Sequence, residues 1–230
     1  MTRLAGLLLL AMALGCSGLD EADAGIVGLE VSYERPDTIE VGETLQLSVR
    51  PLDKQGDSVP AAVTWVALDP TVTLDAATGL MTGAAPGTAR VQATVGSLSS
   101  PLLTFAVIAP ADTLVIAGDS VFTVAIDAAS PPLVTRLESL HPPGVLAGRA
   151  VSYAITSPDP LAATPTVTLS TAALADTFLT AADGTVSTVT VVPVAGGVPP
   201  DSVVVEVRAS RTRGAVVPGS GQRFIVRFQP

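Results

Sequence analysis

Few residues of this 230-residue chain could carry out catalysis. His141 is the only histidine and stands in the run His141-Pro142-Pro143-Gly144. A general base needs a nucleophile or an acid within hydrogen-bond reach, and the sequence marks no such partner. We therefore interpret His141 as part of a rigid loop beside two prolines.

The serine in Gly219-Ser220-Gly221 is also a poor candidate nucleophile. A nucleophile elbow places G-x-S-x-G between a strand and a helix, and this segment is expected to be a loop. Spacing typical of zinc or haem ligands does not occur. We predict that the chain is not an enzyme and has no catalytic residue and no cofactor.

Three aspartates in expected loops could offer oxygen ligands to calcium. Asp53 and Asp57 flank Gly56, and Asp159 stands between two prolines. Calcium takes about six to eight oxygen ligands, and the acidic spacing of a calcium loop is absent. We interpret these residues as solvated turn aspartates and predict no metal site.

The beginning of the chain predicts export. Arg3 precedes an apolar run over residues 4–14. This run is shorter than the ~20 residues that span a bilayer, but its length suits the core of a signal peptide. We predict a cleaved signal peptide over residues 1–15, followed at 16–25 by Cys16 and an acidic tether.

Cys16 is the only cysteine. The segment Ala13-Leu14-Gly15-Cys16 resembles the bacterial lipoprotein box. That resemblance implies a lipid on Cys16 that anchors the chain to a membrane, and Ser17 then implies an outer-membrane or cell-surface location. In the alternative, cleavage after Ala13 leaves a free thiol near the new N-terminus, and the protein is periplasmic or secreted.

The composition favours short strands and disfavours nucleic acid as a partner. Hydrophobic residues make up 48% of the chain, charged residues 14% and aromatic residues 3%. Valine and threonine between frequent glycines and prolines are typical of strands and turns. The net charge of −9 opposes binding to phosphates, which requires clustered Lys and Arg. We predict an all-β fold.

The segment 63–95 indicates a β-sandwich core. Val63, Trp65 and Ala67 alternate on one face, which is typical of a half-buried strand. Trp65 is the only tryptophan, and we predict that it lies at the centre of the core. Gly79 follows at a turn where a positive φ is expected.

Ordered blocks along residues 26–109 resemble the group 2 bacterial immunoglobulin-like family. The matching segments are Val41-Gly42-Glu43-Thr44-Leu45-Gln46-Leu47, Thr64-Trp65, Asp69-Pro70, Thr78-Gly79-Leu80-Met81-Thr82-Gly83 and Gly87-Thr88-Ala89-Arg90-Val91-Gln92-Ala93. The resemblance implies an immunoglobulin-like (Ig-like) β-sandwich that serves as a surface or secreted adhesion or spacer module. It implies no catalytic residue.

A second sandwich is predicted over residues 110–230. Val151, Tyr153 and Ile155 are expected to face inward, residues 172–179 to form a strand or a helical turn, and residues 185–192 to form one strand. The segments 148–155 and 182–187 resemble the invasin-type (group 1) bacterial Ig-like pattern. The sequence thus predicts two tandem Ig-like β-sandwiches.

Arginines gather near the end of this acidic chain. They are Arg208, Arg211, Arg213, Arg223 and Arg227. One interpretation is a patch for an anionic surface polymer, and the other is a solvated face with a flexible loop at 211–221. Sandwich loops carry recognition while the sheets hold them, so Arg211, Arg213 and Arg223 mark the candidate binding loop.

These observations lead to one expected function and one alternative. We expect a non-catalytic, envelope-anchored binding or adhesion module whose partner is a protein or a surface polymer. The alternative is a structural spacer, or an accessory subunit of an envelope assembly, with no ligand of its own. Aromatic platforms for sugars are not expected at the surface, because Trp65 is expected in the core and Tyr33 and Tyr153 lie on expected strands.

Overall fold

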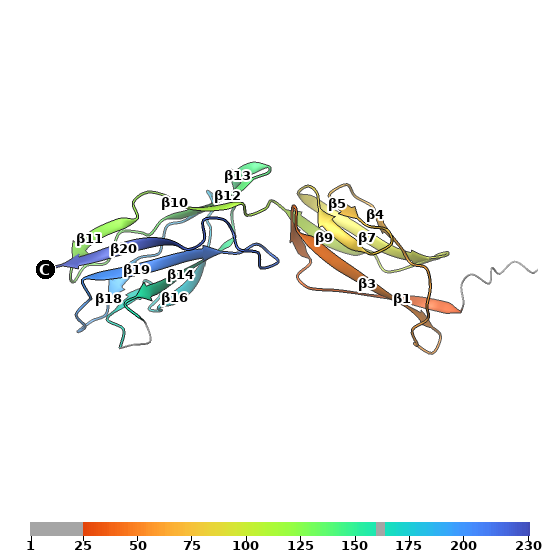
Figure 1. Ribbon diagram of the computed structural model, residues 1–230, viewed down its shortest axis with the longest axis horizontal. Coiled ribbons are helices and arrows are strands. Elements are labelled where there is room, and N and C mark those ends of the chain that lie inside the picture. The colour runs from red at the N-terminus through yellow and green to blue at the C-terminus, as the bar shows by residue number, and fades with distance from the viewer. Residues whose placement is uncertain (1–24, 160–163) are drawn as a thin grey trace, which may run out of the picture.

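The computed structural model describes residues 25–159 and 164–230, and within these residues it contains strands and turns but no helix (Figure 1). No helix in this part of the chain is long and apolar enough to cross a membrane. The predicted signal peptide, Cys16 and nearly all of the predicted tether lie outside the described residues. The predicted all-β fold of Ig-like sandwiches is confirmed.

The first sandwich is built from nine strands in two sheets. The sheet orders are β1-β3-β6-β5 and β2-β9-β7-β4, with β8 paired to β7. The strands are β1 (Ile26–Tyr33), β2 (Thr38–Glu40), β3 (Thr44–Asp53), β4 (Thr64–Ala67), β5 (Val72–Leu74), β6 (Leu80–Gly83), β7 (Gly87–Val95), β8 (Leu98–Ser99) and β9 (Leu103–Ile108).

Trp65 lies in the core of this sandwich, as predicted. Its side chain is 4% exposed, and Val63 and Ala67 on the same face pack against the core while remaining partly exposed. Gly79 lies beneath the indole with a φ of +74°, and a Cβ there would lie 2.6 Å from Trp65 Nε1. Only glycine combines this backbone conformation with so close an approach.

Among residues 110–159 and 164–230, the second sandwich contains eleven strands. A five-stranded sheet has the order β11-β20-β19-β14-β16, a second sheet has β10-β12-β13 with β17 on β12, and β15 pairs with β18. The strands are β10 (Thr113–Ile116), β11 (Val121–Ala125), β12 (Thr135–Leu140), β13 (Pro143–Val145), β14 (Ala150–Ser157), β15 (Val167–Leu169), β16 (Ala175–Leu179), β17 (Thr185–Val186), β18 (Val191–Pro193), β19 (Ser202–Ala209) and β20 (Gln222–Gln229).

Tyr153 is the largest fully buried side chain of the second core. Val151 and Ile155 point inward beside it, as their alternation predicts. The Tyr153 hydroxyl lies 2.6 Å from Thr135 Oγ1 and donates a hydrogen bond to the carbonyl oxygen of Leu133 at 3.1 Å. Burial raises the pKa of Tyr153 to about 12, because the phenolate would lose its hydration.

Two local expectations for this half are wrong. The expected single strand at 185–192 is divided into β17, which pairs with β12, and β18, which pairs with β15. The chain passes between sheets there, and the carbonyl oxygen of Val189 accepts a hydrogen bond from the amide of Leu133. The expected rigid loop at 141–144 contains part of β13, which pairs with β12.

The two sandwiches lie end to end in an elongated molecule (Figure 1). Each encloses its own cluster of buried residues: one from Leu29 to Val107, the other from Ala111 to Phe228. The segment from β9 to β10 connects them. The end of β2, Arg149 just before β14, and the loop between β19 and β20 meet at this connection through hydrogen bonds.

Candidate functional site

A buried carboxylate lies where the two sandwiches meet. Glu40 ends β2 of the first sandwich, and its side chain is fully buried. Glu43, three residues later, is also buried. A buried charge is costly unless it is paired and hydrogen-bonded, so the groups around Glu40 determine what this site does.

The Glu40 carboxylate is held by groups that follow the first sandwich in the chain. Oε1 accepts hydrogen bonds from Arg149 Nη2, from the amide of Thr212 at 2.9 Å and from Thr212 Oγ1 at 3.1 Å. Oε2 accepts one from the amide of Ala111 at 2.7 Å, and Arg211 Nε lies 3.9 Å from it. Both oxygens are therefore used in connecting the sandwiches.

Glu43 adds a second connection through the turn that follows β2. Its Oε2 accepts a hydrogen bond from the amide of Glu40 at 2.9 Å, and its Oε1 accepts one from the amide of Arg213 at 3.0 Å. Gly42 between them adopts a φ of +84°. This tight turn places both carboxylates toward the second sandwich.

The segment 211–213 of the second sandwich contacts both the first sandwich and the connecting segment. Arg211 donates to the carbonyl oxygen of Ala111 at 3.0 Å and to Asp112 Oδ1 at 2.6 Å. Arg213 donates to the carbonyl oxygens of Glu34 and Pro36 at 3.0 and 2.9 Å. We call Glu40, Glu43, Ala111, Asp112, Arg149 and the segment 211–213 the joint.

The charges of the joint balance one another. Glu40, Glu43 and Asp112 carry three negative charges, and Arg149, Arg211 and Arg213 carry three positive ones. Burial and then the like charge of Arg211 lower the pKa of Arg149, but a guanidinium remains protonated in proteins. These three guanidinium groups therefore match the three carboxylates in number.

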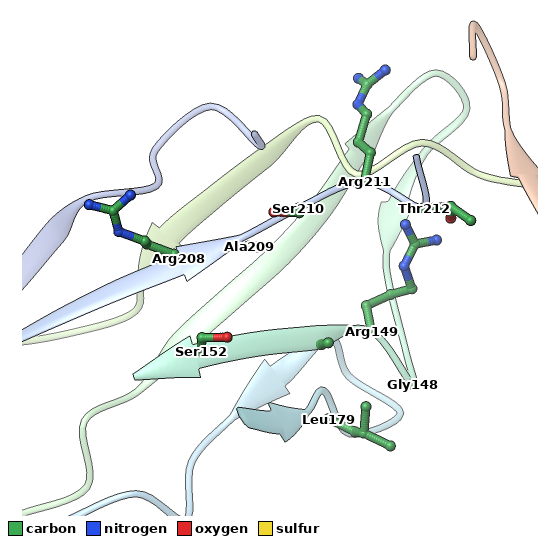
Figure 2. Close-up of a pocket in the computed structure, with 10 residues that line it drawn as sticks. Gly148, Arg149, Ser152, Leu179, Arg208, Ala209, Ser210, Arg211 and Thr212 are labelled. Carbon is green, nitrogen blue, oxygen red and sulfur yellow. The ribbon is translucent and has the colours of Figure 1, made fainter. Parts of the chain in front are cut away.

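A hollow of about 410 Å³ opens beside the joint. Figure 2 shows the Arg149 side chain directed toward Thr212, whereas that of Arg208 is directed away from both. Arg149 and Arg211 line the hollow but are already paired at the joint. Most of the other lining residues are small or carry a hydroxyl group. Its lining comprises Gly148, Arg149, Ala150, Ser152, Leu179, Arg208, Ala209, Ser210, Arg211 and Thr212.

The structure separates the three arginines of the predicted binding loop. Arg211 and Arg213 lie at the joint, whereas Arg223 pairs with Glu206 on the five-stranded sheet. The segment 211–221 is also more fixed than the expected flexible loop, because Val217 is buried and its amide donates to the carbonyl oxygen of Ala209. Recognition of a ligand by this segment stays a prediction.

The other residues considered for chemistry occupy structural positions. His141 lies in the turn between β12 and β13, where its amide donates to Ser139 Oγ. Ser220 Oγ accepts from the amide of Ala209 and donates to the carbonyl oxygen of the same residue, both at 3.0 Å. Ser220 is thereby engaged with β19 rather than presented as a nucleophile.

The candidate calcium aspartates do not form a ligand cluster. Asp53 Oδ1 accepts hydrogen bonds from the amides of Gln55 and Asp57, both at 2.9 Å, so it closes its own turn. Asp159 lies far along the chain, next to residues 160–163 that the structure does not describe. Among residues 25–159 and 164–230, no group of three or more His, Cys, Asp or Glu side chains could hold a metal ion.

Sequence reasoning missed the roles of Glu40, Glu43 and Arg149. Glu40 stands in a short strand where alternation places a polar residue at the surface, and the second sandwich covers that surface. Arg149 lies two positions before Val151, where the expected alternation begins. No local signal distinguishes these residues from solvated charges, because the partners of Glu40 and Glu43 beyond the first sandwich lie 71 or more positions away.

The first sandwich matches a known protein family. Residues 28–102 match the bacterial Ig-like domain (group 2). This confirms the group 2 resemblance over most of the segment in which it was expected. None of the curated proteins matches the chain.

Solved structures with similar arrangements include surface proteins and fibronectin-like modules. The adhesin InvE of Yersinia pseudotuberculosis is 19% identical with a TM-score of 0.40; the alignment covers 90% of this chain and 61% of that one. Domains 4 and 5 of the S-layer protein SbsC are 18% identical, with a TM-score of 0.33 and coverage of 90% and 100%. Fibronectin(III)-like modules of Clostridium thermocellum CbhA are 14% identical, with a TM-score of 0.39 and coverage of 87% and 94%.

Proposed function

We propose that this chain is a non-catalytic module of the bacterial cell surface, in which two Ig-like sandwiches form one stiff arm that presents a binding surface. The observation that carries the proposal is the engagement of buried Glu40 by Arg149, Thr212 and Ala111. A freely bending connection would leave that carboxylate without partners. The group 2 Ig-like match of residues 28–102 supports the surface location.

The stiffness follows from the chemistry of the joint. Domains that touch through small, polar surfaces usually move relative to each other. Here, bending would expose the Glu40 carboxylate or leave it buried without its partners. Breaking a buried ion pair in this way costs about 3–5 kcal/mol. The Arg213 side chain adds hydrogen bonds to Glu34 and Pro36 on the first sandwich. The arm therefore favours one relative orientation of its sandwiches.

The proposal includes a lipid anchor on Cys16. Lipid chains bind a membrane with ~0.8 kcal/mol for each buried CH₂ group, and residues 17–25 would separate the anchor from β1. Fractionation of cells that express the full chain tests this part. We expect the wild type in the membrane fraction and Cys16→Ser in the soluble fraction. Unchanged membrane fractionation of the variant would refute lipidation.

The same joint is compatible with a spacer that has no ligand. A pull-down separates the two functions: residues 17–230 are immobilised and incubated with envelope extract. Reproducible capture of one partner, competed by free residues 17–230, supports the binding module. Capture of nothing above a blank resin contradicts it and favours the spacer.

A further inference from the structure

The structure divides the five arginines near the end of the chain into two groups. Arg211 and Arg213 are used at the joint. Arg208, Arg223 and Arg227 instead lie on β19 and β20, and all three are exposed. We call these three residues, with Glu206, the arginine track.

The members of the track share the outer face of the five-stranded sheet. On β20 the inward residues Phe224, Val226 and Phe228 are buried, so Arg223 and Arg227 point outward because side chains alternate along a strand. Glu206 lies opposite Arg223, and Ser202 opposite Arg227. With a rise of about 3.3 Å per residue, the track extends roughly 20 Å along the strands, from Arg208 to the level of Ser202.

The track has an excess of positive charge. Glu206 is its only carboxylate, and it pairs with Arg208 Nη2 at 2.5 Å and with Arg223 Nη2 at 3.2 Å. Its hydrogen bond to Arg208, assisted by Arg223, lowers the pKa of Glu206, which keeps it ionised. Arg227 has no ion pair among the described residues. Three guanidinium groups thus share one carboxylate, within a chain of net charge −9.

The neighbouring strands leave the track accessible. The side chains of Arg208 and Arg223 are 69% and 63% exposed. No aromatic or methionine side chain points outward from β14, β16, β19 or β20. Arginine is itself enriched at protein–protein interfaces, so a protein partner is kept as one outcome of the test below. Toward β14 and β16, and apart from Leu179 at the end of β16, the exposed residues of this face are small or carry hydroxyl groups, as Ala150, Ser152, Ala175 and Thr177 do.

We propose that the arginine track binds a linear polyanion that carries carboxylate or phosphate groups. A line of cations matches an extended chain with repeated anionic groups. Arg227 can bind one such group through two parallel hydrogen bonds, whereas Arg208 and Arg223 direct Nε and Nη2 at Glu206 and offer their other N–H groups to the polymer. This inference deepens the proposed function, because it assigns the binding surface of the arm and the chemical class of its partner.

Binding of defined polymers to residues 17–230 tests the proposal. The probes are polygalacturonate for carboxylates and inorganic polyphosphate for phosphates, and fully methyl-esterified polygalacturonate is the uncharged comparison. We expect at least one anionic probe to bind, no binding of the esterified probe, and an affinity that falls with salt. The more tightly bound probe identifies the anionic group.

Two triple variants with the same change in net charge make the test specific. Arg208→Gln/Arg223→Gln/Arg227→Gln removes the track. Arg50→Gln/Arg90→Gln/Arg136→Gln removes exposed arginines whose carboxylate partners are Glu30, Asp69 and Glu138. We expect the track variant to bind about tenfold or more weakly, and its salt slope to fall by about one for each anionic group that a guanidinium no longer neutralises. The control variant should bind like the wild type.

Several outcomes would overturn the proposal. Absence of binding by both anionic probes would do so, as would equal reductions of affinity in the two variants. Capture of an acidic protein through the track, with no polymer bound, would replace the polymer with a protein partner. Because the polymer assay uses soluble chain, failed anchoring or a flexible joint would contradict the proposed function and leave this inference intact. Circular dichroism of both variants checks that they remain folded.

Discussion

The Arg149 guanidinium of the second sandwich donates a hydrogen bond to the buried carboxylate of Glu40 in the first, across 109 positions of sequence. Glu40 has no exposed surface, and the Arg149 side chain is only 14% exposed. An ion pair of this kind is more sensitive to the loss of one partner than an exposed pair is, because the remaining charge stays buried. The relative orientation of the sandwiches is therefore expected to be sensitive to the loss of this carboxylate.

Glu40→Gln should destabilise the joint. The amide keeps the shape of the side chain but removes its negative charge and replaces one of the two acceptor oxygens with an NH₂ donor. Arg149 and Arg211 then lie close together without the Glu40 charge between them. We expect a loss of about 3–5 kcal/mol, measured by urea unfolding as a lower midpoint or as separation of one transition into two. The matched control is Glu30→Gln, which breaks the exposed pair with Arg50.

The control variant should change the free energy of unfolding by less than about 1 kcal/mol, because exposed pairs contribute little. Equal effects of Glu30→Gln and Glu40→Gln would show that the joint is an ordinary solvated contact.

Gly79→Ala should damage the first core more than a glycine substitution elsewhere. The new Cβ would lie 2.6 Å from Trp65 Nε1 and 2.7 Å from the carbonyl oxygen of Leu47. Gly56→Ala is the matched control, because Gly56 has a φ of +86° and nothing near its Cβ position. The control therefore carries the backbone strain without the collision.

We expect Gly79→Ala to cost about 1–3 kcal/mol more than Gly56→Ala, which is the range for overpacked cores. Thermal unfolding followed by Trp65 fluorescence measures both. Similar unfolding temperatures, or ready quenching of native Trp65 by iodide, would mean that the indole does not pack as described.

Stability should fall at alkaline pH because of Tyr153. Burial raises the folded-state pKa of Tyr153 to about 12 from the ordinary 10.0. The folded state thus holds the proton more tightly than the unfolded state. The resulting stabilisation is complete below the unfolded-state pKa and is lost as the pH rises toward the folded-state pKa.

Near-ultraviolet absorbance of tyrosinate follows this titration. Burial also raises the pKa of Tyr33, the other tyrosine, so native protein should ionise later than urea-unfolded protein. Tyr153→Phe should remove the native-state ionisation step at a pKa of about 12 and flatten the alkaline decline in unfolding free energy. Coincident titration of native and unfolded protein would contradict the burial of Tyr153.

The core of each sandwich could be predicted from sequence because its signals are local. Alternation placed Val151, Tyr153 and Ile155 inside, and a lone tryptophan marked the centre of the first core. The strand break between β17 and β18 could not be predicted, because valine and threonine continue through it and the crossing depends on which sheet is nearer.

The joint could not be predicted, because residue type reports the face on which a side chain lies but not what covers that face. Glu40 in a short strand has the pattern of a solvated residue, and it becomes buried only when Arg149 and Thr212 reach it from a distant part of the chain. The same limit applies to the arginines near the C-terminus. Their number is evident from the sequence, but their division between the joint and the β19–β20 face depends on strand register.

The distance between spin labels on the two sandwiches tests the stiff arm most directly. Residues 17–230 contain no cysteine, so labels on Gln55→Cys and Asp127→Cys, both at exposed positions, report only that distance by pulsed electron paramagnetic resonance. We predict one narrow distribution for the labelled protein and a broader one when Glu40→Gln is added. A broad distribution that is the same with and without Glu40→Gln would contradict a joint fixed by that carboxylate.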